Sequence, residues 1–169
     1  MTKIIHWSNV RNYNSIMADG VIELEGYSTE KLAKEVGWDK IKSAYGVSGL
    51  QMKRMRKEQN KWVGQYVWFT EEEDAKCTSS IMNTEKVGYE FDAEEISAER
   101  WTVIAQRQIM KKGSRAKKLI RVLNATAKLN GDDITKWWVV KKPVSLELCK
   151  NIDCKQLYPI INNLEKEAA

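Results

Sequence analysis

His6 is the residue of this chain with the clearest capacity for chemistry, and it lies near the end of an apolar stretch, 3–7, with Ser8 just after it. An imidazole can act as acid, base or hydrogen-bond donor near neutral pH. His6 is the only histidine, so mechanisms that need two imidazoles are excluded. Taken alone, a histidine on a strand more often has a structural role, and Ser8 has an equally simple one as the N-cap of the next helix.

A second candidate is the aromatic segment 65–70, which gives the strongest strand signal in the chain because aromatic and β-branched residues dominate it. Its rings could form the wall of a ligand pocket. They could equally fill a hydrophobic core, which is the commoner role for a tryptophan, since each buries a large apolar area and needs one partner for its N–H. The same alternative applies to four of the tryptophans in the expected strands: Trp68, Trp101, Trp137 and Trp138.

Several classes of site have no signature here. The chain contains no glycine-rich phosphate loop, no Ser-His-Asp order and no paired-carboxylate motif. Its three cysteines, Cys77, Cys149 and Cys154, lack metal-ligand spacing, so we expect no zinc site but reduced thiols in a cytoplasmic protein. The chain enters a strand-like stretch at once, which is unlike a signal peptide, and no apolar run approaches the roughly 20 residues that span a bilayer.

The net charge of +5 is unevenly distributed. Residues 105–129 contain no acid and eight cations: Arg107, Lys111, Lys112, Arg115, Lys117, Lys118, Arg121 and Lys128. A second cluster holds five cations opposed by Glu58 alone: Lys53, Arg54, Arg56, Lys57 and Lys61. Clustered positive charge favours a phosphate-bearing partner, either nucleic acid or a dinucleotide. The alternative is that these cations form only a solvated surface.

Strands and helices that must position these residues are mixed along the chain without regular β-α-β alternation. We expect strands at 3–7, 21–24, 65–70, 87–91, 101–106 and 137–140. We expect helices from 10 to a stop at Gly20, from Ser28 to about 36, and from Ser114 to a stop at Asn130-Gly131, while 52–61 is helical or mobile. The pattern predicts one α+β domain over 1–169, with small mixed or antiparallel sheets and flanking helices.

Together these segments resemble the ADP-ribosyltransferase superfamily, in particular prokaryotic members that act on nucleic acid, such as the DarT-type toxins. Those proteins open with a strand carrying His-x-Thr or His-x-Ser, here His6-Trp7-Ser8. A helix closing with Ile-x-x-x-Gly follows, here Ile16 to Gly20. Residues 66–70 look like the family's Val-x-Phe-Tyr-Phe-Thr strand, and residues 136–145 are similar to the last core strand and its exit.

The resemblance implies an ADP-ribosyltransferase-like fold with NAD as substrate. His6 and Ser8 would hydrogen-bond the adenosine ribose and the nicotinamide side of NAD. Tyr66, Trp68 and Thr70 would belong to the NAD site, and the rings of Tyr66 and Trp68 would form the wall on which the cationic nicotinamide stacks. Either Arg11 or Arg56 would pair with the pyrophosphate, whose oxygens suit the two parallel donors of a guanidinium.

The chain departs from the family at the catalytic glutamate. That residue should fall near the start of the 137–140 strand, where this sequence has Thr135-Lys136. Asp133 lies just before this point and Glu147 lies after it. Either Asp133 substitutes for the glutamate, or the alignment is shifted by a few residues, or transferase activity has been lost.

Two hypotheses about function follow. The first is an NAD-dependent ADP-ribosyltransferase-like protein that modifies a macromolecule, with nucleic acid preferred over protein and with His6 and Asp133 as its catalytic residues. The second is a non-catalytic basic protein that binds nucleic acid, a nucleotide signal or a partner protein, of a kind common among phage and mobile-element genes. Binding that weakens steeply with salt and does not depend on His6 would favour the second.

Overall fold

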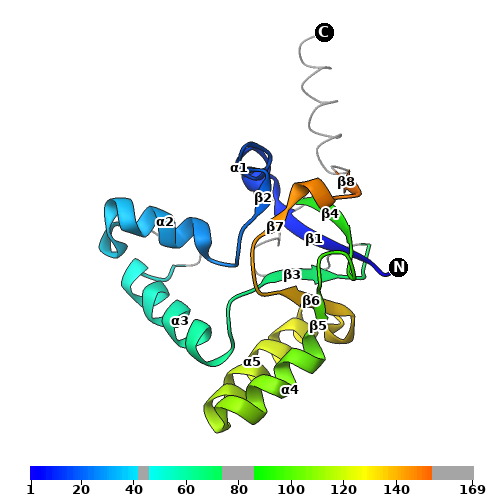
Figure 1. Ribbon diagram of the computed structural model, residues 1–169. Helices are drawn as coiled ribbons and strands as arrows, with labels where there is room; N and C mark the ends of the chain where they lie inside the picture. Colours follow the sequence, from blue (N-terminus) through cyan, green and yellow to red (C-terminus); the bar gives the residue numbers. More distant parts are fainter. Residues whose placement is uncertain (42–45, 74–85, 154–169) are drawn as a thin grey trace.

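A six-stranded antiparallel sheet is the centre of the computed structural model, which describes residues 1–41, 46–73 and 86–153 (Figure 1). The strand order is β5-β6-β3-β1-β4-β8. The strands are β1 (Lys3–Asn9), β3 (Val67–Thr70), β4 (Lys86–Asp92), β5 (Glu99–Arg100), β6 (Trp137–Val140) and β8 (Asn151–Asp153). Strands β1 and β4 pair along their whole length, from Lys3 opposite Asp92 to Asn9 opposite Lys86. The chain therefore has the α+β class and antiparallel sheet that its sequence predicts.

Five α-helices and a second, two-stranded sheet complete the described structure (Figure 1). The helices are α1 (Tyr13–Asp19), α2 (Tyr27–Val36), α3 (Gly49–Trp62), α4 (Trp101–Lys112) and α5 (Ser114–Leu129). The small sheet pairs β2 (Val21–Ile22) with β7 (Val144–Ser145). Short 3-10 turns lie at Val10–Asn12, Trp38–Lys40, Ile134–Lys136 and Leu146–Leu148. The helices of the described part are all too short or too polar to span a bilayer.

The large sheet is covered on both faces, so it separates two hydrophobic cores. The first core contains Ile4, Phe69 and Tyr89 from the large sheet and Ile22 from the small one, and α1 contributes Tyr13 and Ile16 to its edge. The second core lies on the opposite face, where α4 and α5 pack. Its buried residues are Val63, Tyr66, Trp101, Ile104, Ala105, Ile120 and Val139. A side chain on the sheet belongs to one core or the other according to its alternation along the strand.

The prediction of a strand at 101–106 is wrong, because these residues begin helix α4. Trp101, Ile104 and Ala105 are its buried residues, and their spacing places them on one helical face against the second core. Aromatic and β-branched side chains in this stretch mimic a strand composition, but packing against α5 and the sheet decides the outcome. The other expected helices are present, including α3 over the basic segment, and Gly20 ends α1 in the left-handed conformation with a φ of 68°.

Candidate functional site

His6 lies on β1 and faces the first core, with its ring against Phe69 and Tyr89 at centroid distances of 5.8 and 6.1 Å. Its Nδ1 is 2.8 Å from the carbonyl oxygen of Trp68. A carbonyl can only accept, so Nδ1 carries the proton and donates it. Burial lowers the pKa of His6 below its ordinary value, so the ring is neutral at pH 7. Strands β1 and β3 pair at Ile5 and Thr70, and one residue further along β1 the imidazole ties the same two strands together.

Three other residues that the sequence predicts for the same site as His6 do not share one arrangement: Ser8, Thr70 and Arg11. Ser8 is buried on the same side of β1, and its hydroxyl accepts a hydrogen bond from the Asn12 side chain at 3.2 Å. Thr70 pairs with Ile5, so its side chain points to the opposite face. The side chain of Arg11 lies outside the part of the chain that the structure describes.

Tyr66 and Trp68 belong to the second core and not to the face that His6 occupies. The ring of Trp68 packs edge-on against Trp101 and Trp137, at centroid distances of 4.8 and 5.5 Å. Its Nε1 donates to Glu25 Oε2 at 2.9 Å. The structure therefore does not bring Tyr66 and Trp68 together with His6 as one wall of a pocket, because alternation along β3 sends them to the other side of the sheet.

Asp133 caps the turn before β6. Its carboxylate accepts hydrogen bonds from the Thr135 hydroxyl at 2.6 Å and the Thr135 backbone N–H at 3.0 Å, and these bonds lower the pKa of Asp133. The neighbouring Ile134 packs against the second core, on the far side of the sheet from the His6 ring. His6 and Asp133, predicted as a catalytic pair, are thus each engaged in local structure and are not brought together.

Arg56 forms part of a partly buried polar cluster between α3 and the segment after β2. Its guanidinium lies 3.5 Å from Glu25, whose carboxylate also accepts hydrogen bonds from Gln59 and Trp68. A Cβ on Gly26 would lie 2.6 Å from the guanidinium, and Gly26 has a φ of +81°, so only glycine fits there. This cluster joins α3 to the sheet, so Arg56 has a structural role and is not free to pair with a pyrophosphate as the sequence predicts.

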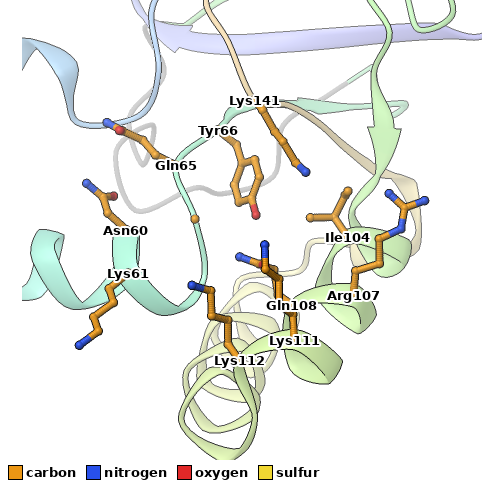
Figure 2. A pocket seen from close by; sticks show the side chains of 11 residues that line it. Asn60, Lys61, Gln65, Tyr66, Ile104, Arg107, Gln108, Lys111, Lys112 and Lys141 are labelled. Carbon is orange, nitrogen blue, oxygen red and sulfur yellow. The ribbon is translucent and has the colours of Figure 1, made fainter.

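A pocket of about 300 Å³ opens between the end of α3, the segment Gly64 to Tyr66, the part of α4 from Ile104 onward and the residue after β6 (Figure 2). Its floor is apolar in character, made by the Tyr66 ring and Ile104, each only 2% exposed. Three amide side chains line it: Asn60, Gln65 and Gln108. Five cations surround it: Lys61, Arg107, Lys111, Lys112 and Lys141.

Among residues 1–41, 46–73 and 86–153, no carboxylate lines this pocket. Arg107 is paired with Glu99 at its outer side, with 2.6 Å between guanidinium nitrogen and carboxylate oxygen, and Lys61 lies over the Trp62 ring. Within the described ranges, no acidic side chain pairs with Lys111, Lys112 or Lys141. Figure 2 shows Lys141 extending toward Tyr66 from above, while Gln108 and Lys111 rise from α4 toward the same ring. The pocket therefore carries a concentrated positive field.

The polar groups at the floor are held in place by one carbonyl. The Tyr66 hydroxyl and the Gln108 side-chain amide both donate to the Val63 carbonyl oxygen, at 2.7 and 2.9 Å. Burial raises the pKa of Tyr66 to about 12, so the phenol stays protonated at physiological pH and adds no negative charge. The floor of the pocket therefore adds no negative charge of its own.

Sequence reasoning found part of this site. The two basic clusters include Lys61, Arg107, Lys111 and Lys112, which the fold brings to one place. It does not predict Lys141, which reaches the pocket through the pairing of β6 with β3, where Val140 lies opposite Val67. It also does not predict the three amides, which lie on α3, just before β3 and on α4. No local signal marks such residues.

The thiols and possible metal ligands of the chain do not form a second candidate site within the described residues. Cys149 is a free, partly buried thiol, and Cys77 and Cys154 lie outside the described residues. The described residues hold no group of three histidine, cysteine or carboxylate side chains placed to bind a metal ion. Comparison of the chain with protein-family models, curated proteins and solved structures gave no match. The case for a function therefore rests on the residues themselves.

Proposed function

We propose that the protein binds nucleic acid through the basic surface, defined here as the five cations around the pocket: Lys61, Arg107, Lys111, Lys112 and Lys141. One observation carries the proposal: these cations come from α3, α4 and the residue after β6, yet they lie around one hollow, and no carboxylate of the described residues lines it. Nucleic-acid phosphates provide the matching anions at close spacing.

The surroundings extend the same charge. Helix α5 packs beside α4 and adds exposed cations on its outer side, among them Lys117, Lys118 and Arg121. Arg115 at its start pairs with Glu58 of α3 at 3.0 Å, which neutralises one acid of the α3 cluster. A long, flexible polyanion can reach the cations of α5 and those around the pocket at the same time, whereas a small anion is too short to do so.

Binding should be strongly dependent on salt. If four phosphates are contacted, the logarithm of the association constant falls with a slope of about −3.6 against the logarithm of salt concentration, and affinity drops roughly 150-fold between 50 and 200 mM salt. The measurement is fluorescence anisotropy of labelled single-stranded and double-stranded oligonucleotides titrated with the protein at several salt concentrations. Lack of binding at 50 mM salt, or a slope near zero, would contradict the proposal.

A second candidate is transfer of ADP-ribose from NAD to nucleic acid. The observation that favours it is the order of the sheet: the three strands that carry the family resemblance, β1, β3 and β6, lie side by side, and His6 and Ser8 share one side of β1. Residues 66, 68 and 133 serve local structure, so His6 is the residue on which this candidate is tested.

The transferase candidate predicts that label from NAD appears on an oligonucleotide and that His6→Asn abolishes the transfer. Asparagine is the matched replacement because its amide N–H can keep the hydrogen bond to the Trp68 carbonyl, while the imidazole is lost. Thermal unfolding checks that the variant remains folded. No labelled product with the wild-type protein, and no NAD binding by calorimetry, would remove this candidate and leave nucleic-acid binding standing.

A further inference from the structure

The basic surface surrounds a pocket, although binding to a phosphate backbone does not require a pocket. Backbone phosphodiesters of a strand can be held by exposed lysines on an open surface. A pocket of about 300 Å³ is instead the size at which small ligands are enclosed. What enters it must be an end or a free molecule, because a continuous strand runs past such an opening unless a nucleotide turns inward.

The floor of the pocket is a built feature. Gly64 has a φ of +111°, and a Cβ there would lie 2.3 Å from the Tyr66 hydroxyl oxygen, so glycine allows the chain to turn tightly over the ring. Tyr66 and Ile104 are almost fully buried, and the Val63 carbonyl fixes both Tyr66 and Gln108. The base of the hollow therefore keeps its shape before a ligand arrives.

Three amide side chains give the pocket neutral polar groups beside its cations: Asn60, Gln65 and Gln108. A side-chain amide offers N–H donors and an oxygen acceptor. A ligand that uses these groups carries hydroxyl or amino groups of its own, such as those of a sugar or a base.

A phosphate for the cations and hydrogen-bonding groups for the amides are both present in a nucleotide. A terminal phosphate is a monoester with a second pKa near 6, so at pH 7 it carries nearly two negative charges, against one for a backbone phosphodiester. Lys111, Lys112 and Lys141 have no acidic partner among the described residues, and they can share this dianion with hydrogen bonds from their ammonium groups.

We propose that the pocket binds a nucleoside monophosphate, with its phosphate held by Lys111, Lys112 and Lys141 and with the rest of the nucleotide over Tyr66 and beside Asn60. The ligand is either the phosphorylated end of a strand or a free nucleotide. The inference deepens the proposed function, since it concerns the same basic surface, and it rests on that function where the nucleotide belongs to a strand.

The test compares one oligonucleotide sequence in three forms: with a 5′ phosphate, with a 3′ phosphate and with hydroxyls at both ends. Anisotropy at fixed salt should show one phosphorylated form binding at least roughly tenfold more tightly than the hydroxyl form, as one added charged hydrogen bond implies. Calorimetry with a free nucleoside monophosphate and with inorganic phosphate is the second experiment. It shows whether the pocket binds a nucleotide that is not part of an oligonucleotide.

Two adjacent lysines supply the variants. Lys141→Gln should lower the ratio between phosphorylated and hydroxyl forms severalfold, because it removes one of the three lysines that hold the phosphate. Lys142→Gln removes the same charge one residue away, at an exposed position that does not line this pocket, and should keep the ratio. Thermal unfolding verifies both variants.

The outcomes separate the two proposals. Equal binding of all three oligonucleotides, with no binding of the free nucleotide, overturns the pocket and leaves nucleic-acid binding intact. Binding of the free nucleotide that depends on Lys141, without binding of any oligonucleotide, keeps the pocket and overturns nucleic-acid binding. Loss of the ratio in Lys142→Gln as well as in Lys141→Gln overturns the assignment of the phosphate to this pocket.

Discussion

Replacing Trp101 by alanine is expected to lower the free energy of unfolding by about 3–5 kcal/mol, which is the usual cost of removing a buried tryptophan. Trp101 is 0% exposed and starts α4 at the centre of the second core. Its ring packs edge-on against Trp68 and Tyr66, at centroid distances of 4.8 and 5.9 Å. Its Nε1 donates to Asn124 Oδ1 at 2.9 Å, so the substitution also removes the partner of an amide on α5.

The measurement is thermal or denaturant unfolding followed by circular dichroism, and the midpoint temperature should fall by about 10 °C or more for a chain of this length. Thr102→Ala is the control, because the neighbouring residue is exposed and its loss should change stability by less than about 0.5 kcal/mol. Since Tyr66 packs on Trp101 and forms the pocket floor, the nucleotide pocket should loosen in the same variant. An unchanged midpoint for Trp101→Ala would mean that the second core is not packed in this way.

Periodicity predicts much of this fold. The alternation and aromatic content of 65–70 and 137–140 give β3 and β6, and the spacing of Ala116, Ile120 and Ala127 gives α5. The prediction for 101–106 fails because its composition is that of a strand, while the residues Val63, Tyr66 and Val139, which share its core, are distant in sequence. Local preference is overridden wherever a tertiary contact stabilises the other conformation.

The positions of the predicted site residues depend even more on contacts between segments that are distant in the sequence. Alternation along β3 already places Tyr66, Trp68 and Thr70 on one side of their strand, opposite Val67 and Phe69. Which of these sides His6 shares depends on the register between β1 and β3, Ile5 opposite Thr70, and no local pattern encodes it. Asp133 followed two residues later by Thr135 is a capping pattern that could have been recognised from the sequence.

Neutralising three cations of the basic surface should weaken nucleic-acid binding about 500-fold at 0.1 M salt. The variant is Lys61→Gln, Lys111→Gln and Lys112→Gln together. Each phosphate contact contributes a slope of about 0.9, so three lost contacts cost about 2.7 logarithmic units between 1 M and 0.1 M salt. The slope itself should become shallower by the same 2.7. All three side chains are exposed, so the fold should be retained.

A matched variant shows whether position or total charge is responsible. Lys117→Gln, Lys118→Gln and Arg121→Gln remove the same three charges from exposed positions on α5, and none of these residues lines the pocket. Screening limits the influence of distant charges at 0.1 M salt, where the Debye length is about 10 Å, so this variant should lose less than about tenfold in affinity. Equal losses in the two variants would mean that total charge, and not the position of the cations around the pocket, determines the affinity. A loss confined to the first variant requires phosphates at the end of α3 and the end of α4, which is where a terminal nucleotide would find the pocket beside it.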